Sequence, residues 1–211
     1  MSPLDIIEEM NRQFDDAIIT TDVGQHMMLV SQYAEITEKK QLVMSGGLGT
    51  MGYGFPAAIG AQIGNPEKRV IAVSGDGGMQ MNIQEFATAV LEETPVIACV
   101  FNNTYLGMVR QWQKLFYGKR YGMTNLRAGA LSRRTDGAEF PEYTPDFVKL
   151  AESYGAKGIR VTKTEEISAA FEEAKKNTKT PTLIEFIIDP EEMVYPMIKP
   201  GGTLEDMIMD C

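Results

Sequence analysis

Two polar residues, Asp76 and Asn103, each follow an apolar, β-rich stretch and lie 27 positions apart. That spacing fits one strand–helix–strand crossover, which would place both side chains about 5 Å apart at one edge of a parallel sheet. One carboxylate and one amide oxygen, with backbone carbonyl and phosphate oxygens, suit a hard cation such as Mg²⁺. Gly77 and Gly78 leave backbone N–H groups accessible to the same anion. The pattern predicts a site for a metal-bound phosphate, although Asp, Asn and Gly also form ordinary turns.

A second glycine-rich segment runs from Ser45 to Gly54 after another apolar stretch. Gly47, Gly49 and Gly52 match the dinucleotide-binding fingerprint, and Asp76 lies where an acidic residue could bind a ribose. Spacing alone therefore leaves open a Rossmann-type dinucleotide-binding module. The position of Asp76 between two glycines, beyond the end of its strand, is more typical of a metal ligand.

Apolar stretches alternate with amphipathic segments, and these elements must position the residues above. We predict strands at 17–21, 41–44, 69–74, 96–101, 158–161 and 182–188, and helices at 25–34, 56–63, 83–92, 107–116, 145–154 and 165–176. Continuous apolar strands between amphipathic helices are typical of a parallel sheet covered on both faces. The predicted fold class is α/β, with a doubly wound, mostly parallel six-stranded sheet. Ligands bind such sheets beyond the carboxyl ends of the strands.

Composition excludes several classes of protein. The 211 residues carry a formal net charge of −9, which argues against a nucleic-acid partner. No apolar run reaches the roughly 20 residues needed to cross a bilayer. Two isolated cysteines, Cys99 and Cys211, form no disulfide framework, as is typical of a reducing compartment. We therefore expect a cytoplasmic protein without a membrane partner.

The motifs resemble those of a known family. Gly75-Asp76-Gly77, followed by Asn102-Asn103, resembles the signature of thiamine diphosphate enzymes. Further segments are similar to the catalytic subunit of acetohydroxyacid synthase (acetolactate synthase), namely 23–26, 45–58, 106–112 and 196–203. The resemblance covers nearly the whole chain but only the C-terminal third of that subunit. It implies a thiamine-diphosphate-binding domain over residues 1–188 and a C-terminal tail over 189–211 that covers the active-site region.

The resemblance also implies a set of site residues. Mg²⁺ would be bound by Asp76, by the side chain of Asn103 and by the backbone carbonyl of Tyr105. Thiamine diphosphate would be bound by Gln25, His26, Gly49, Thr50, Met51, Asp76, Gly77, Gly78, Asn103, Tyr105, Leu106, Gly107 and Met108. Met51 would hold the cofactor bent. Trp112 and Met108 would form walls of the substrate pocket, although the helical spacing of Met108 is equally typical of a core residue.

His26 is the only histidine. A lone histidine is usually structural, but this one follows the end of a predicted strand beside Gly24. We interpret it as a hydrogen-bond donor to phosphate rather than as a general base.

The implied reaction decarboxylates pyruvate and condenses it with a second 2-ketoacid, such as pyruvate or 2-ketobutyrate, in branched-chain amino-acid biosynthesis. Another thiamine-diphosphate-dependent 2-ketoacid decarboxylase or carboligase is the alternative within the cofactor class. In the family, the activating glutamate comes from the pyrimidine-binding N-terminal domain of a partner subunit, and no residue here matches it. We therefore expect a homo-oligomer, a small regulatory subunit as a further family partner, FAD in the full enzyme, and no activity from these 211 residues alone.

The sequence departs from the family pattern in one polar, arginine-rich stretch between about residues 118 and 143. It contains Arg120, Arg127, Arg133 and Arg134. An unpatterned loop of this length is usually functional or disordered. The stretch from about 125 to 142 is longer than in the family pattern. The resemblance therefore does not predict how this loop closes over the site.

Overall fold

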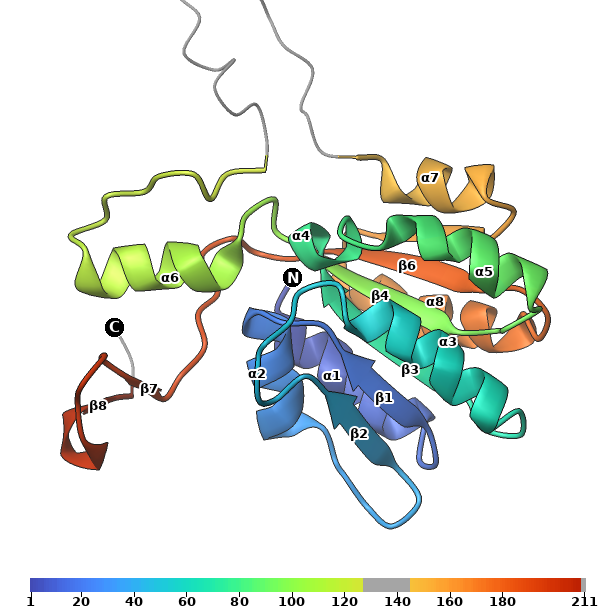
Figure 1. Cartoon of the computed structure of the whole chain (residues 1–211), viewed down its shortest axis with the longest axis horizontal. Coiled ribbons are helices and arrows are strands. Elements are labelled where there is room, and N and C mark those ends of the chain that lie inside the picture. The colour runs from blue at the N-terminus through green and yellow to red at the C-terminus, as the bar shows by residue number, and fades with distance from the viewer. Residues whose placement is uncertain (127–144, 210–211) are drawn as a thin grey trace, which may run out of the picture.

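A computed structural model describes residues 1–126 and 145–209 of the chain. Most of the arginine-rich stretch, including Arg127, Arg133 and Arg134, therefore lies outside the described residues, as does Cys211. Six strands form one sheet in the order β2-β1-β3-β4-β6-β5, and every neighbouring pair is parallel (Figure 1). The strands are β1 (Ile18–Thr21), β2 (Gln41–Met44), β3 (Val70–Gly75), β4 (Ile97–Asn102), β5 (Lys157–Val161) and β6 (Thr182–Ile187). The predicted α/β fold class and its six-stranded sheet are confirmed.

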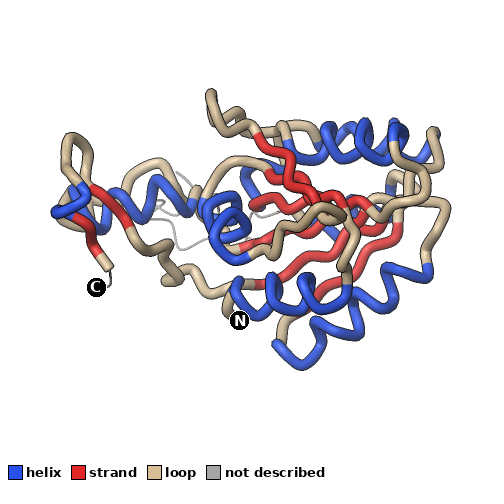
Figure 2. Tube along the Cα trace, turned by 90° about the horizontal axis from the view of Figure 1, so that it is seen from below, coloured by secondary structure: helices blue, strands red, loops and turns tan. Residues whose placement is uncertain are grey.

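Helices cover both faces of the sheet, as Figure 2 shows edge-on. One face packs against α1 (Pro3–Gln13), α2 (Gln25–Tyr33) and α8 (Ile167–Lys176), and the other against α3 (Gly54–Gly64), α5 (Phe86–Leu91) and α7 (Phe147–Ser153). Consecutive strand residues alternate between the two cores, so Ile71 and Val73 face one cluster while Val70 and Ala72 face the other. This alternation explains why the strands are continuously apolar.

The remaining elements are short or lie beyond the layers. They are α4 (Asp76–Met79), α6 (Gly107–Phe116), the β7–β8 hairpin (Met197–Ile198 with Met207–Ile208), and 3₁₀ turns at Ile83–Glu85, Thr164–Glu166 and Leu204–Asp206. Both α6 and the hairpin extend to one side of the sheet (Figure 1). The tail is partly integrated into the domain, because Val194 is fully buried in a core cluster. Within the described residues, every helix is too short or too polar to serve as a membrane span.

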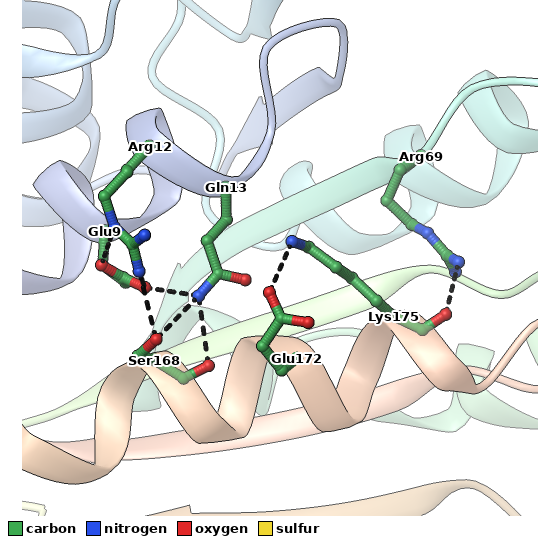
Figure 3. A network of polar contacts seen from close by, with 7 residues as sticks. All are labelled: Glu9, Arg12, Gln13, Arg69, Ser168, Glu172 and Lys175. Carbon is green, nitrogen blue, oxygen red and sulfur yellow. Dashed lines mark hydrogen bonds and ion pairs between the residues drawn. The ribbon is translucent and has the colours of Figure 1, made fainter.

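Polar contacts fix α8 against the sheet and against α1 (Figure 3). The Gln13 side chain donates to the carbonyl of Ser168 at 3.1 Å. At the other end of α8, the Arg69 guanidinium donates to the carbonyls of Lys175 and Asn177, each at 3.1 Å. A cation there satisfies carbonyl groups that a helix C-terminus leaves unpaired. Arg69 directly precedes β3, so this contact anchors the strand whose opposite end carries Asp76.

Candidate functional site

A cavity of about 320 Å³ lies where the strand order reverses. The chain leaves β1 toward β2 on one side and returns to β3 on the other, so the switch point lies between β1 and β3. Ligands bind at such points, outside the carboxyl ends of the strands. The cavity lies within the size range of small-molecule sites. Its walls come from the turns after β1, β2, β3 and β4, the start of α6 and part of the tail.

The structure brings nearly all the predicted cofactor-binding residues to this cavity. The residues that line it are Gln25, His26, Gly49, Met51, Asp76, Gly77, Gly78, Asn103, Tyr105, Leu106, Gly107 and Met108. Thr50 does not line it, because it is exposed and its N–H donates to the Ser45 hydroxyl at 3.2 Å within the glycine-rich turn. Trp112 instead lines an adjoining hollow of about 540 Å³ on α6, which shares Met108 with the first cavity. A substrate-pocket role for Trp112 therefore remains a prediction.

Asp76 and Asn103 follow neighbouring strands, since β3 pairs with β4 up to Gly75 opposite Phe101. Asp76 is 2% exposed and Asn103 is 8% exposed. One Asp76 oxygen, Oδ1, accepts the Gly77 N–H at 2.9 Å, while the other, Oδ2, is buried without a hydrogen-bond partner among the described residues. A buried carboxylate oxygen without a partner is costly, and a cation would satisfy it.

Burial raises the pKa of Asp76 to about 7, against the opposing effect of the backbone hydrogen bond from Gly77. A divalent cation would reverse this shift by stabilising the carboxylate. Within the described ranges, no group of three or more His, Cys, Asp or Glu side chains could hold a metal. A cation at Asp76 would therefore need the amide oxygen of Asn103, a backbone carbonyl and oxygens from the ligand. These are all hard donors, so the site fits Mg²⁺ chemically.

His26 lies at the switch point with its ring between two glycines. A Cβ atom on Gly24 would lie 2.9 Å from His26 Cε1, and one on Gly75 would lie 3.1 Å from it. Burial lowers the pKa of His26 to about 4, although the charge of Asp22 and a hydrogen bond with its backbone oppose the shift. The imidazole is therefore neutral at neutral pH. Its Nε2 is buried at the cavity and lacks a partner within the described part of the chain.

Asp22 is a site residue that sequence reasoning missed. Its carboxylate accepts N–H groups from Val23 at 2.7 Å, from Gly52 at 2.9 Å and from Gly54 at 3.4 Å. These bonds tie the glycine-rich turn to the end of β1. Gly49 and Gly52 within that turn have φ of 64° and 88°, values that favour glycine. The only sequence signal was an acidic residue directly after a strand, and its partners are backbone groups that no motif encodes.

The same contacts argue against the dinucleotide alternative. A Rossmann pyrophosphate needs the backbone N–H groups of the glycine-rich turn. Here the Gly52 N–H is already bound to the Asp22 carboxylate, and an anion at this turn would face that negative charge. A Cβ on Gly47 would meet nothing within 4 Å, so no close packing requires glycine there.

Part of the C-terminal tail borders the cavity through two glutamines. The Gln111 side chain donates to the Val194 carbonyl at 2.8 Å and accepts the Val194 N–H at 2.9 Å. Gln25 donates to Gln111 at 2.8 Å and to the Glu192 carbonyl at 3.1 Å. The tail is thereby fixed to α6 and to the turn after β1.

Together, the topology and the cavity define a class of protein: an α/β domain with a glycine-lined cavity at the switch point of its sheet, where such folds bind small ligands. Residues 22–186 match the family described as the C-terminal TPP (thiamine pyrophosphate, or diphosphate) binding domain of thiamine pyrophosphate enzymes. The chain belongs to this family.

Individual relatives of the chain indicate which thiamine pyrophosphate enzymes it resembles. The chain is 42% identical over 205 residues to the probable acetolactate synthase large subunit of Methanocaldococcus jannaschii, covering 97% of this chain and 32% of that protein. It is 42% identical over 208 residues to the acetolactate synthase large subunit of Corynebacterium glutamicum, covering 98% and 32%. For the isozyme 3 large subunit of Escherichia coli (strain K12), identity is 40% over 194 residues, covering 91% and 31%. The chain thus spans about a third of these relatives, and the resemblance to acetolactate synthase is confirmed.

Proposed function

We propose that this chain is the cofactor-binding part of an acetolactate synthase large subunit and holds thiamine diphosphate through Mg²⁺. One observation carries the proposal: a buried carboxylate oxygen of Asp76 lacks a partner among the described residues, in a cavity that Asn103 shares. Both residues lie within the span that matches the family. The cavity has no lysine or arginine among its described lining residues, so a diphosphate there needs a cation.

The roles of individual residues follow from their positions. Asp76, the Asn103 side chain and the Tyr105 carbonyl would hold the cation. Gly77 and Gly78 line the cavity and would let the ligand approach the backbone, because glycine carries no side chain. Close packing also requires glycine there, since a Cβ on either residue would lie within 2.8 Å of a neighbouring side chain. When bound, thiamine diphosphate supplies an electron sink for decarboxylation of 2-ketoacids.

The other lining residues orient and enclose the cofactor. The neutral His26 has a single N–H, which would donate to a phosphate oxygen in place of its hydrogen bond to the Asp22 backbone. Gln25 borders the same region, held in place by Gln111. Gly49 and Met51 would face the pyrimidine end, with Met51 holding the bent conformation. Met108 and Trp112 on α6 would exclude water and shape the pocket for the second ketoacid.

We propose that the reaction joins pyruvate, after loss of CO₂, to pyruvate or 2-ketobutyrate, as in branched-chain amino-acid biosynthesis. The relatives are named large subunits, which supports a multi-subunit enzyme. The activating glutamate would come from the N-terminal domain of a partner subunit, and FAD would bind mainly through other parts of the enzyme. These 211 residues alone would then bind the cofactor without forming acetolactate.

Calorimetry tests the cofactor assignment. Titration with thiamine diphosphate and with NADH, each with and without Mg²⁺, should give heat only for thiamine diphosphate with Mg²⁺. Asp76→Ala should abolish that signal, while replacement of the exposed Asp16 with Ala should preserve it. Binding of NADH without metal would instead support the dinucleotide-binding module.

A chimera tests the reaction. This chain would replace the corresponding third of the Corynebacterium glutamicum large subunit, to which it is 42% identical. We expect the chimera to form acetolactate from pyruvate, and the same chimera carrying Asp76→Ala to form none. A properly assembled chimera that decarboxylates pyruvate without condensing it would favour the alternative decarboxylase.

A further inference from the structure

Glu185 is a buried carboxylate in the middle of β6 that the proposed cofactor site does not use. It is 2% exposed, and both of its oxygens are engaged. Oε1 accepts from the Asn102 side-chain amide at 2.7 Å, and Oε2 accepts from the Arg160 guanidinium at 2.7 Å. Arg160 also donates to Asp146, the N-cap of α7, at 2.6 Å. The charge is thus fully hydrogen-bonded, as a buried carboxylate requires.

Asn102 connects this carboxylate to the loop that follows β4. Its side-chain oxygen accepts the Thr104 N–H at 3.0 Å. Thr104 has a φ of 64°, in the left-handed region that β-branched residues rarely adopt. The next residue is held in the same way, because the Asn103 side-chain oxygen accepts the Tyr105 N–H at 3.0 Å. Two successive side-chain-to-backbone bonds therefore fix the loop.

Glu185 determines which way the Asn102 amide points. An ionised carboxylate only accepts hydrogen bonds, so the amide must turn its NH₂ group toward Glu185. Its oxygen then faces the Thr104 N–H and supports the unusual φ. An acceptor at position 185 is therefore needed for the loop to keep this shape.

We infer that Glu185 is a positioning residue for the cation site, acting through Asn102 on the loop that presents Asn103 and the Tyr105 carbonyl. The inference rests on the proposed function, in which those two groups bind Mg²⁺. Partners of this kind, one step removed from a metal, commonly tune its affinity.

A purely structural role for Glu185 makes a different prediction. Removal of one member of an ion pair that contains a buried carboxylate destabilises the fold as a whole. Positioning, by contrast, requires a local effect on the loop and a matching effect on the metal. The two roles are separated by measuring hydrogen exchange residue by residue.

The experiment uses the metal-free 211-residue chain and two variants, Glu185→Gln and Asn102→Ala. In Glu185→Gln, the charged Arg160 guanidinium takes the one remaining carbonyl oxygen, so an NH₂ group instead of an acceptor faces the Asn102 amide. The control is Glu173→Gln, which breaks the partly exposed ion pair of Glu173 with Lys157. We expect the Thr104 amide to exchange about tenfold faster in both variants, as for loss of one ordinary hydrogen bond. Amides in the centres of β3 and β4 should keep their protection. The control should leave the Thr104 amide unchanged.

The same proteins are then titrated with Mg²⁺ in the presence of saturating thiamine diphosphate. The apparent dissociation constant for Mg²⁺ should rise about 10-fold to 100-fold in both variants and stay constant in the control. Unchanged exchange at Thr104 in both variants would overturn the inference, and so would a loosened loop with unchanged Mg²⁺ affinity. If Glu185→Gln does not fold, Asn102→Ala carries the test because it leaves the Arg160 pair intact. Absence of Mg²⁺-dependent binding by the unmodified chain would overturn the proposed function, while exchange at Thr104 would still decide the positioning role.

Discussion

Replacement of Asp76 with Asn should stabilise the metal-free chain at pH 8 and abolish its stabilisation by Mg²⁺ with thiamine diphosphate. The reason is that Asp76 is buried for a ligand rather than for the fold. Its Oδ2 lacks a partner among the described residues, and burial raises its pKa to about 7. An amide keeps an acceptor for the Gly77 N–H, which Asp76 Oδ1 now binds at 2.9 Å, but carries no charge.

The magnitude follows from linkage between protonation and folding. The pKa of Asp76 rises from 3.8 to about 7, and each pKa unit corresponds to about 1.4 kcal/mol, so the carboxylate costs the fold on the order of 4 kcal/mol above pH 7. The introduced amide leaves one buried NH₂ group without a partner, which costs about 1–3 kcal/mol. The net gain in the free energy of unfolding at pH 8 is therefore on the order of 1–3 kcal/mol.

The sign of the pH dependence is also fixed. Between about pH 4 and pH 7 the folded chain retains the Asp76 proton while the unfolded chain releases it. The contribution of Asp76 to stability is therefore fully present below about pH 4 and is lost as the pH rises through 7. The advantage of Asp76→Asn should grow across this window and level off above it.

Urea unfolding with a chelator at pH 4.5, 6 and 8 measures this difference. Asp16→Asn is the control, because Asp16 is exposed and its loss changes the net charge equally. Saturating Mg²⁺ and thiamine diphosphate should then reverse the order, since a ligand at 1,000 times its dissociation constant adds about 4.1 kcal/mol only to the chain that binds it. A destabilised Asp76→Asn variant at pH 8 without metal would refute the reasoning.

Two further outcomes follow from the site geometry. Because burial lowers the pKa of His26 to about 4, the only imidazole NMR signals of the chain should stay constant from pH 8 down to about pH 5; titration near pH 6.5 would show that the ring is hydrated. Gly107→Ala should weaken cofactor binding measured by calorimetry, because a Cβ there would lie 2.1 Å from Gln25 Oε1. The control Gly60→Ala, on α3 with nothing within 4 Å of the added Cβ, should stabilise the helix by up to about 1 kcal/mol and leave binding unchanged.

The sheet could be predicted from sequence because its strands are buried on both faces. Each strand is a short apolar run, and the intervening amphipathic segments provide the crossovers that parallel pairing requires. Because β3 and β4 are neighbouring strands, Asp76 and Asn103 lie close together, and no other sequence feature is needed to predict this. Gly75 and Phe101 are register partners, so the two polar residues necessarily follow at one edge.

Other parts of the site could not be predicted, because the residues concerned bind backbone groups or side chains that are far away in the sequence. Asp22 binds N–H groups from a turn about 30 residues later. Glu185 binds Asn102 from the neighbouring strand β6, at a separation of 83 residues in the sequence. Val194 is buried in the core, and the Gln111 side chain bonds its backbone N–H. The neighbouring tail sequence is rich in proline and polar residues, so no local pattern indicates this burial. Hydrogen bonds of this kind depend on the folded path of the chain rather than on any local pattern.

The acidic composition gives the cation a specific role. The described lining of the cavity has no lysine or arginine, and burial keeps His26 neutral. Backbone N–H dipoles offset a diphosphate only in part, since even a helix end amounts to about half an elementary charge. The remaining charge must come from a metal, and Asp76 supplies the carboxylate that holds it. It follows that diphosphate affinity should disappear entirely when Mg²⁺ is chelated, rather than fall to a weaker level set by a basic side chain.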